Sequence, residues 1–247
     1  MIELQDVYDK YLDGKIEEHR LKYKDFKGYF NASSAGKCYK QMYYRITDTD
    51  PQPIEIKSKR LLRLGTILHS DFESALNEYS NTVDKEYLEI LTEHRIVLED
   101  FKVIGHLDTA VINKQFNTMY LYDLKSISDW NYRMKAGRVA NRRPTSPHYF
   151  MQLGTYAIGL QEQYKDFNFE EDSIQLKWYN KNDSRMTSEI VNTECIENAR
   201  DYWQDLNDFV EEEGENILEI EPSTAIGVPF ASWECNYCQF SKICIGE

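Results

Sequence analysis

The amino-acid sequence predicts an α/β fold in which a central mixed or mainly antiparallel sheet is flanked by helices. Apolar residues recur at helical spacing over residues 58–79 and again after Pro147. Between these helices, residues 86–125 are dominated by strand-like runs, and two further strands are expected at 173–180 and 185–191. Strands that are interrupted by helical segments in this way favour a sheet with helices on its faces.

The composition suits one catalytic domain. The chain has 247 residues, of which 41% are hydrophobic, and this is enough apolar material for a sizeable core. No apolar run is long enough to span a bilayer, and the first residues lack the features of a secretory signal, so we expect a cytoplasmic protein with no membrane partner. The formal net charge of −13 argues against broad adhesion to polyanions, although local basic patches matter more than the sum.

Helices dominate the expected structure of the amino-terminal third. Residues 3–24 have the pattern of an amphipathic helix that serves packing or interaction. A turn of small residues within 31–45 opens a short helix, where backbone N–H groups and Lys37 suit a phosphate; a solvated helix end is the alternative. On the long helix at 58–79, His69 shares a face with the acidic residue four positions later.

Two predicted strands carry a group of charged side chains. Strand alternation over 118–125 puts Asp123 and Lys125 on one face, and a hairpin would bring them beside Asp108 of the preceding strand. Two carboxylates and an ammonium suit a divalent metal, with the lysine placed to steer or deprotonate a metal-bound water; a surface ion pair is the alternative. Alternation over 101–112 puts four side chains on one face: Ile104, His106, Asp108 and Ala110.

A basic segment follows the second of these strands. Residues 129–147 hold five cations and one acid, with Gly137 and Pro144 and no clear period, which predicts a mobile and partly helical arm or lid. Such a segment favours contact with phosphates, and a solvated basic loop is the alternative. The candidate DNA-binding residues in it are Arg133, Lys135, Arg138, Arg142 and Arg143.

The second half of the chain contributes two more helices. Ser146 and Pro147 are suited to start one of them, on which Gln152 and Tyr156 lie four residues apart on one face. Without other evidence, that pair would belong to the edge of the core. In the last long helix, Cys195 falls within the apolar stripe and is expected to be a buried thiol.

The remaining cysteines have the spacing of a metal site. Cys235, Cys238 and Cys244 form a C-x2-C-x5-C knuckle, and Cys38 is the obvious fourth ligand. Four thiolates satisfy either a tetrahedral zinc ion or a 4Fe–4S cluster, and thiol chemistry alone does not separate the two. Either would tie the amino-terminal third of the chain to its carboxyl terminus.

Taken in order, these motifs resemble those of the RecB-like branch of the PD-(D/E)XK nucleases. The likeness extends from about residue 30 to residue 244 and is strongest to iron–sulfur members: CRISPR-associated adaptation nucleases, their phage-borne relatives and the AddB nuclease domain. No proline precedes Asp108, and Gly-X-X-Asp is the usual RecB-like form. The motifs are SAGKC at 34–38, LGTILH at 64–69, GHLD at 105–108, DLK at 123–125, Gln152 with Tyr156, and the three terminal cysteines.

The resemblance implies a restriction-endonuclease-like core with an iron–sulfur-stapled helical layer. Residues 1–247 would form a single nuclease domain, in which 30–80 and 220–247 make the stapled helical part around a catalytic core at 85–215. It implies that Lys125 positions or activates the attacking water, while Gln152 and Tyr156 orient the active site or the DNA.

The resemblance also implies two metal centres. Mg²⁺ or Mn²⁺ would be held by His69, Asp108, Asp123 and the backbone carbonyl of Leu124. A structural 4Fe–4S cluster would be held by Cys38, Cys235, Cys238 and Cys244, since four thiolates leave it no open position.

The function expected from the sequence is therefore that of a metal-dependent DNA nuclease. We expect an exonuclease on single-stranded DNA or frayed ends, with residues 130–145 as a lid that contacts DNA. It would act in a bacterial or phage-infected cell, as a homo-oligomer or with recombination or CRISPR partner proteins. The alternatives are a nucleic-acid-binding adaptor of the same fold without useful catalysis and a zinc-stapled nuclease.

Overall fold

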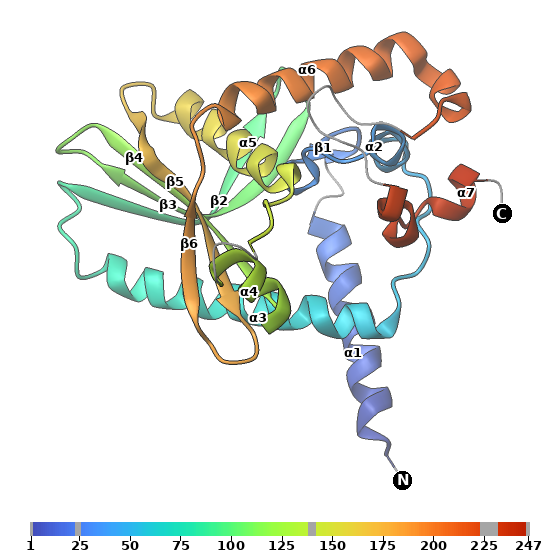
Figure 1. Cartoon of the computed structure of the whole chain (residues 1–247), viewed down its shortest axis with the longest axis horizontal. Coiled ribbons are helices and arrows are strands. Elements are labelled where there is room, and N and C mark those ends of the chain that lie inside the picture. The colour runs from blue at the N-terminus through green and yellow to red at the C-terminus, as the bar shows by residue number, and fades with distance from the viewer. Residues whose placement is uncertain (1, 23–25, 138–141, 223–231, 246–247) are drawn as a thin grey trace.

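The computed structural model describes residues 2–22, 26–137, 142–222 and 232–245. A six-stranded mixed sheet lies between helices, which confirms the predicted fold class (Figure 1). No helix among the described residues is long and apolar enough to cross a membrane.

The sheet is built around an antiparallel meander. β2, β3 and β4 pair antiparallel in sequence, β5 lies parallel to β4, and β6 returns antiparallel to β5. Asn117 closes the β3–β4 turn with a φ of 53°, a conformation that asparagine tolerates better than most residues. The bounds are β1 (Phe30–Asn31), β2 (Leu88–Leu98), β3 (Val103–Asn113), β4 (Thr118–Ile127), β5 (Asn168–Asn180) and β6 (Met186–Ile190).

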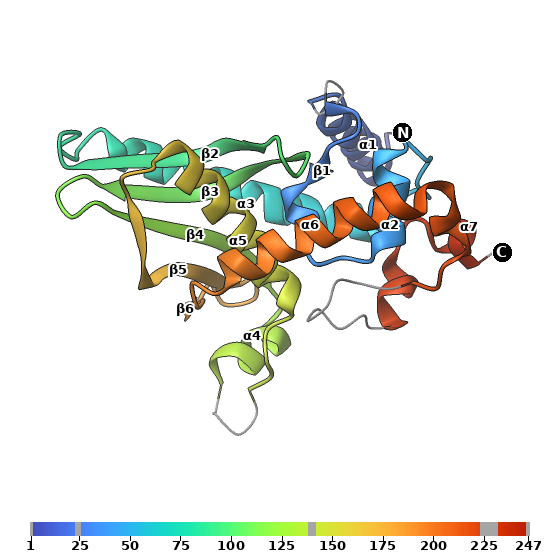
Figure 2. The same ribbon diagram turned by 90° about the horizontal axis from the view of Figure 1, so that it is seen from above.

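Helices cover both faces of this sheet. α3 runs along one face, and α5 and α6 lie on the other (Figures 1 and 2). Among the described residues, the α-helices are α1 (Leu4–Lys22), α2 (Tyr39–Ile46), α3 (Ile56–Ser80), α4 (Asp129–Ala136), α5 (Pro147–Gln163), α6 (Cys195–Glu213) and α7 (Ser241–Ile245), and 3-10 helices cover Ala32–Ser34, Gly214–Glu219 and Ser232–Tyr237.

The core lies between the sheet, α5 and α6. Every residue of α5 from Met151 to Leu160 is buried, because the helix is enclosed by strands on one side and α6 on the other. Gly154 allows this close packing, since a Cβ there would lie 1.9 Å from the carbonyl oxygen of Cys195. Cys195 is buried as predicted, and burial raises the pKa of its thiol to about 12.

α3 packs against the opposite face much less tightly. It contacts β2, β3 and β4, but none of its residues is fully buried. Half-buried side chains such as Phe72 and Leu76 point toward the sheet from this helix. The α3 face therefore keeps open space next to the strands that carry the predicted charged residues.

Candidate active site

The predicted acidic residues Asp108 and Asp123 lie where the paired strands β3 and β4 separate, which we call the β3–β4 fork. Pairing between these strands ends at Thr109 and Tyr122, while β1 pairs with the same edge of β3 only at 103–104. Residues 105–108 therefore have no strand partner on that edge. The backbone N–H of Leu124 reaches across the gap and donates a hydrogen bond to Asp108 Oδ2 at 2.8 Å.

Strand alternation fails within β3, and the predicted common face of Ile104, His106, Asp108 and Ala110 is wrong. A Cβ at Gly105 would lie 3.1 Å from Tyr156 of α5. Four residues later, Thr109 pairs with Thr92, whose side chain bonds to Asn77 of α3. Glu93, opposite the break, has a φ of 44°. Asp108 consequently reaches α3, whereas Ala110 pairs with Leu121 in the core.

Three candidate metal ligands meet at this break. Nδ1 of His69, on α3, lies 3.4 Å from Oδ2 of Asp108. One ligand atom from each of His69, Asp108 and Glu93 lies within 4.8 Å of the other two. The hydrogen bond to Asp108 raises the pKa of His69, against an opposing effect of burial. Two carboxylates and an imidazole form a donor set that fits Mn²⁺ or Mg²⁺.

Sequence reasoning did not find Glu93. In the sequence, Glu93 stands in a predicted strand between Thr92 and His94, and nothing there marks it as a metal ligand. Its carboxylate lies near His69 and Asp108 because the backbone is distorted at this residue. A strand residue with positive φ is the structural signal that marks it.

Glu93 is predicted to contribute to metal affinity. Glu93→Gln should weaken Mn²⁺ binding about tenfold or more, because the variant loses a ligand charge. Isothermal titration calorimetry on the purified chain would measure this, with Glu86→Gln, at an exposed position before β2, as the matched control. Equal affinity in both variants would remove Glu93 from the site.

Asp123 and Lys125 form the other side of the site. Asp123 is 1% exposed, and its Oδ2 lies 2.8 Å from the ammonium of Lys125. Burial raises the pKa of Asp123 to about 6, and Lys125 opposes that shift. Apart from the ammonium of Lys125, Asp123 Oδ2 has no polar partner among the described residues. A buried carboxylate oxygen with a single partner keeps a lone pair that can face a metal ion.

Gln152 and Tyr156 hold this ion pair from α5. Gln152 donates from Nε2 to Asp123 Oδ1 at 3.3 Å and to the Tyr156 hydroxyl at 3.1 Å, and its Oε1 accepts from Lys125 Nζ at 3.2 Å. Lys125 is thereby fixed by two partners. The structure brings together the side chains that the motifs singled out, while a role for the Leu124 carbonyl stays a prediction.

His148, in the first turn of α5, adds a pH-dependent contribution to stability. Burial, and then the charges of Lys37 and Lys125, lower its pKa to about 4. The unfolded chain, with a histidine pKa near 6.5, takes up this proton first as the pH falls, so His148 stabilises the fold above that value and this stability is lost toward pH 4. His148→Gln should reduce the loss between pH 7 and pH 5 by about 2 kcal/mol in urea unfolding. Parallel losses in parent and variant would contradict this expectation.

The four predicted cysteine ligands line one cavity of about 540 Å³. Cys38 lies at the start of α2, and Cys235, Cys238 and Cys244 come from the carboxyl-terminal segment beside it (Figure 2). The segments also bond directly, since the backbone N–H of Gln52 donates to the Gln239 carbonyl at 2.8 Å. No three of these thiols lie within 4.8 Å of one another.

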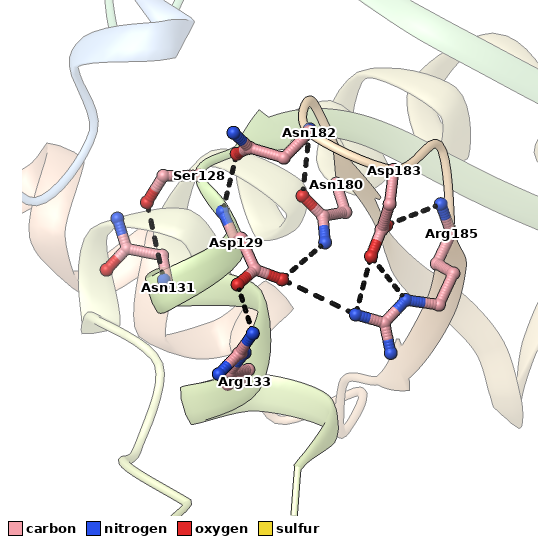
Figure 3. Close-up of polar contacts among 8 residues, drawn as sticks. All are labelled: Ser128, Asp129, Asn131, Arg133, Asn180, Asn182, Asp183 and Arg185. Atoms are coloured by element: carbon pink, nitrogen blue, oxygen red, sulfur yellow. Dashed lines mark hydrogen bonds and ion pairs between the residues drawn. The ribbon is translucent and has the colours of Figure 1, made fainter.

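The first residues of the predicted arm (129–147) are held against the β5–β6 turn by the contacts of Asp129. Asp129 begins α4, and its N–H donates to Asn182 while its carboxylate accepts from Asn180 and pairs with Arg133 and Arg185 (Figure 3). The partners other than Arg133 belong to the end of β5 and the turn into β6. The segment is partly helical as predicted, and Asp129 anchors its first residues, while the mobility of the arm stays a prediction.

Several candidate DNA-binding cations have other roles in the structure. Lys135 donates to Thr145 at 2.6 Å and lies over the Trp178 ring, and burial lowers its pKa. Arg142 and Arg143 are exposed, with Arg143 over the Trp130 ring. Burial and nearby Arg45 lower the pKa of Lys37 to about 8. Arg138 falls outside the described residues.

Comparisons with known proteins add a family-level match. A sequence model described as the PD-(D/E)XK nuclease superfamily matches residues 51–245. The solved structure of SSO0001 has a TM-score of 0.55 at 18% identity, covering 97% of this chain and 96% of that one, and shows a shared fold. A structure from Eubacterium rectale, provisionally named an exonuclease, has a TM-score of 0.44 at 12% identity, with 86% and 95% covered. The search for relatives among curated proteins found no match.

Proposed function

The chain belongs to the PD-(D/E)XK nuclease superfamily, and we propose that it is a metal-dependent deoxyribonuclease of the RecB-like branch. Its substrate would be single-stranded DNA or frayed ends, cut as an exonuclease. The observation that carries this proposal is the convergence of His69, Glu93 and Asp108 with the Asp123–Lys125 pair at the β3–β4 fork. Nucleases of this superfamily typically use Mg²⁺ or Mn²⁺, which suits this donor set.

Each side chain has a role in phosphodiester hydrolysis. When bound, Mg²⁺ or Mn²⁺ would supply a nucleophilic water at neutral pH and countercharge for the phosphate. His69, Glu93 and Asp108 would hold the ion, and the buried carboxylate of Asp123 would contribute a further negative charge beside it. Lys125, fixed by Asp123 and Gln152, would orient the attacking water and stabilise charge that develops on the scissile phosphate.

Cleavage of differently blocked strands tests this function. The full chain would be incubated with Mg²⁺ or Mn²⁺ and with 5′-blocked, 3′-blocked or circular single-stranded DNA. We expect cleavage of linear strands from one end and no cleavage of circles. Cleavage of circles would overturn the exonuclease assignment, and intact linear strands with both metals would overturn the nuclease assignment in favour of a binding adaptor.

We further propose that Cys38, Cys235, Cys238 and Cys244 hold a structural 4Fe–4S cluster, as in iron–sulfur members of the branch. Their shared cavity supports one centre. A tetrahedral zinc ion is the alternative occupant, since four thiolates satisfy it as well. Residues 30–80 and 220–247 would then close around the 85–215 core as one nuclease domain.

A further inference from the structure

A cavity of about 380 Å³ continues from the candidate metal ligands across the α3 face of the sheet. His69, Glu93 and Asp108 line one part of it. The rest of the cavity lies between α3, β4 and the β5–β6 hairpin and is lined by residues other than these three candidate ligands. Its volume lies in the range of small-molecule sites and exceeds what an ion and its waters require.

The cavity follows from the loose packing of α3. This helix contacts β2, β3 and β4 without burying a single residue. Phe72 points from α3 into the open space and meets the edge of the Tyr179 ring, at 6.2 Å between centroids and 83° between planes. With Leu76 of α3 and Tyr122 of β4, Phe72 gives the cavity walls of aromatic and aliphatic side chains.

Polar groups border the wall opposite α3. The ammonium of Lys177 lies 4.9 Å from the centre of the Tyr122 ring and donates to Ser188 Oγ at 2.8 Å. Thr187 and Ser188 line the same side. A flat ring that enters between Phe72 and Tyr122 would therefore meet apolar surface on its faces and hydrogen-bonding groups at its edge.

We propose that this cavity is a nucleobase subsite, which takes the base of the nucleotide whose phosphate lies at His69, Glu93 and Asp108. The inference rests on the proposed nuclease function and adds a source of substrate selectivity to it. A base held in a duplex cannot enter the cavity, whereas an unpaired base can leave the strand and stack on aromatic side chains. Since every base has a π-face, the subsite would select single strands without selecting sequence.

Abasic substrates test the subsite. Single strands with one abasic nucleotide at successive positions would be cleaved by the full chain and bound to it with Ca²⁺ in place of Mg²⁺. We expect one abasic position to lower kcat/KM and affinity at least about fivefold. Phe72→Ala should show a similar loss with intact DNA and no response to the abasic position. Leu64→Ala, an exposed position on the same helix, is the matched control.

Two further measurements distinguish a failure of the subsite proposal from a failure of the nuclease proposal. Mn²⁺ affinity of Phe72→Ala should equal that of the parent, which shows that the ligands are intact, and Leu76→Trp should reproduce the loss by filling the cavity. Equal cleavage and binding of abasic and intact strands by the parent would overturn the subsite while the nuclease stands. Discrimination in binding without any cleavage would support the subsite and overturn the proposed nuclease activity.

Discussion

Lys125→Met is expected to lower the rate of DNA cleavage by about 100- to 1000-fold without unfolding the protein. The ammonium of Lys125 is held by Asp123 and Gln152 beside the candidate metal ligands, where it can stabilise charge that appears during hydrolysis. Methionine keeps much of the side-chain volume but removes that charge. Asp123 can respond by taking up a proton, because burial already raises its pKa to about 6.

Single-turnover cleavage of end-labelled single strands would measure the effect, since it reports the chemical step. Lys10→Met, at an exposed position of α1, is the matched control and should cleave as fast as the parent. Circular dichroism would show whether each variant is folded. A folded Lys125→Met protein with the parent's single-turnover rate would remove Lys125 from the chemistry.

Cys38→Ser is expected to remove the proposed iron–sulfur cluster and to lower the thermal midpoint by about 10 °C or more. Cys38 is the one proposed ligand outside the carboxyl-terminal segment, so its loss disconnects α2 from that segment. The absorption of the parent in the visible range should disappear in the variant. Cys195→Ser is the matched control: Cys195 is buried at the start of α6 and does not line the cavity that the other four thiols share, so its replacement should leave the absorption unchanged.

Metal analysis would accompany these spectra. A colourless parent with one zinc ion per chain would replace the iron–sulfur assignment by the zinc alternative. A parent with neither metal would contradict both, and an unchanged spectrum in Cys38→Ser would exclude Cys38 as a ligand.

The long helices and the β3–β4 hairpin could be predicted because apolar side chains recur in them at the spacing of a helix or of a strand. His69, Asp123 and Lys125 could be placed for the same reason, since regular elements fix which side chains share a face. The cysteine set was also accessible, because its spacing is a property of the sequence alone.

The sequence could not show features that depend on local departures from regular structure. Alternation placed Asp108 and Ala110 on one face, but the β2–β3 pairing is interrupted at Glu93 and Asp108, where Glu93 has a φ of 44°, and the faces of β3 change there. β5 begins at Asn168, before its predicted start, because pairing with β4 extends it through an acidic stretch that lacks a strand pattern. The anchoring of α4 depends on Asp129, whose partners lie about fifty residues later.

The loose packing of α3 was equally hidden. Apolar residues at helical spacing over 58–79 predicted a long helix, and the helix formed, but none of its residues is fully buried, and Phe72 and Leu76 stay partly exposed to the cavity. The helical period predicts which side chains face the sheet, but not how closely the helix packs against it. The proposed nucleobase subsite lies in the space that this loose packing leaves.

We infer that the β3–β4 fork is the metal centre of a nuclease, and anomalous diffraction from a crystal of the full chain soaked in Mn²⁺ would locate that centre. We expect an anomalous peak within about 2.0–2.4 Å of ligand atoms from His69 and Asp108, with Glu93 or Asp123 completing the set. A Mn²⁺-dependent enzyme whose only peaks lie away from the fork would contradict it.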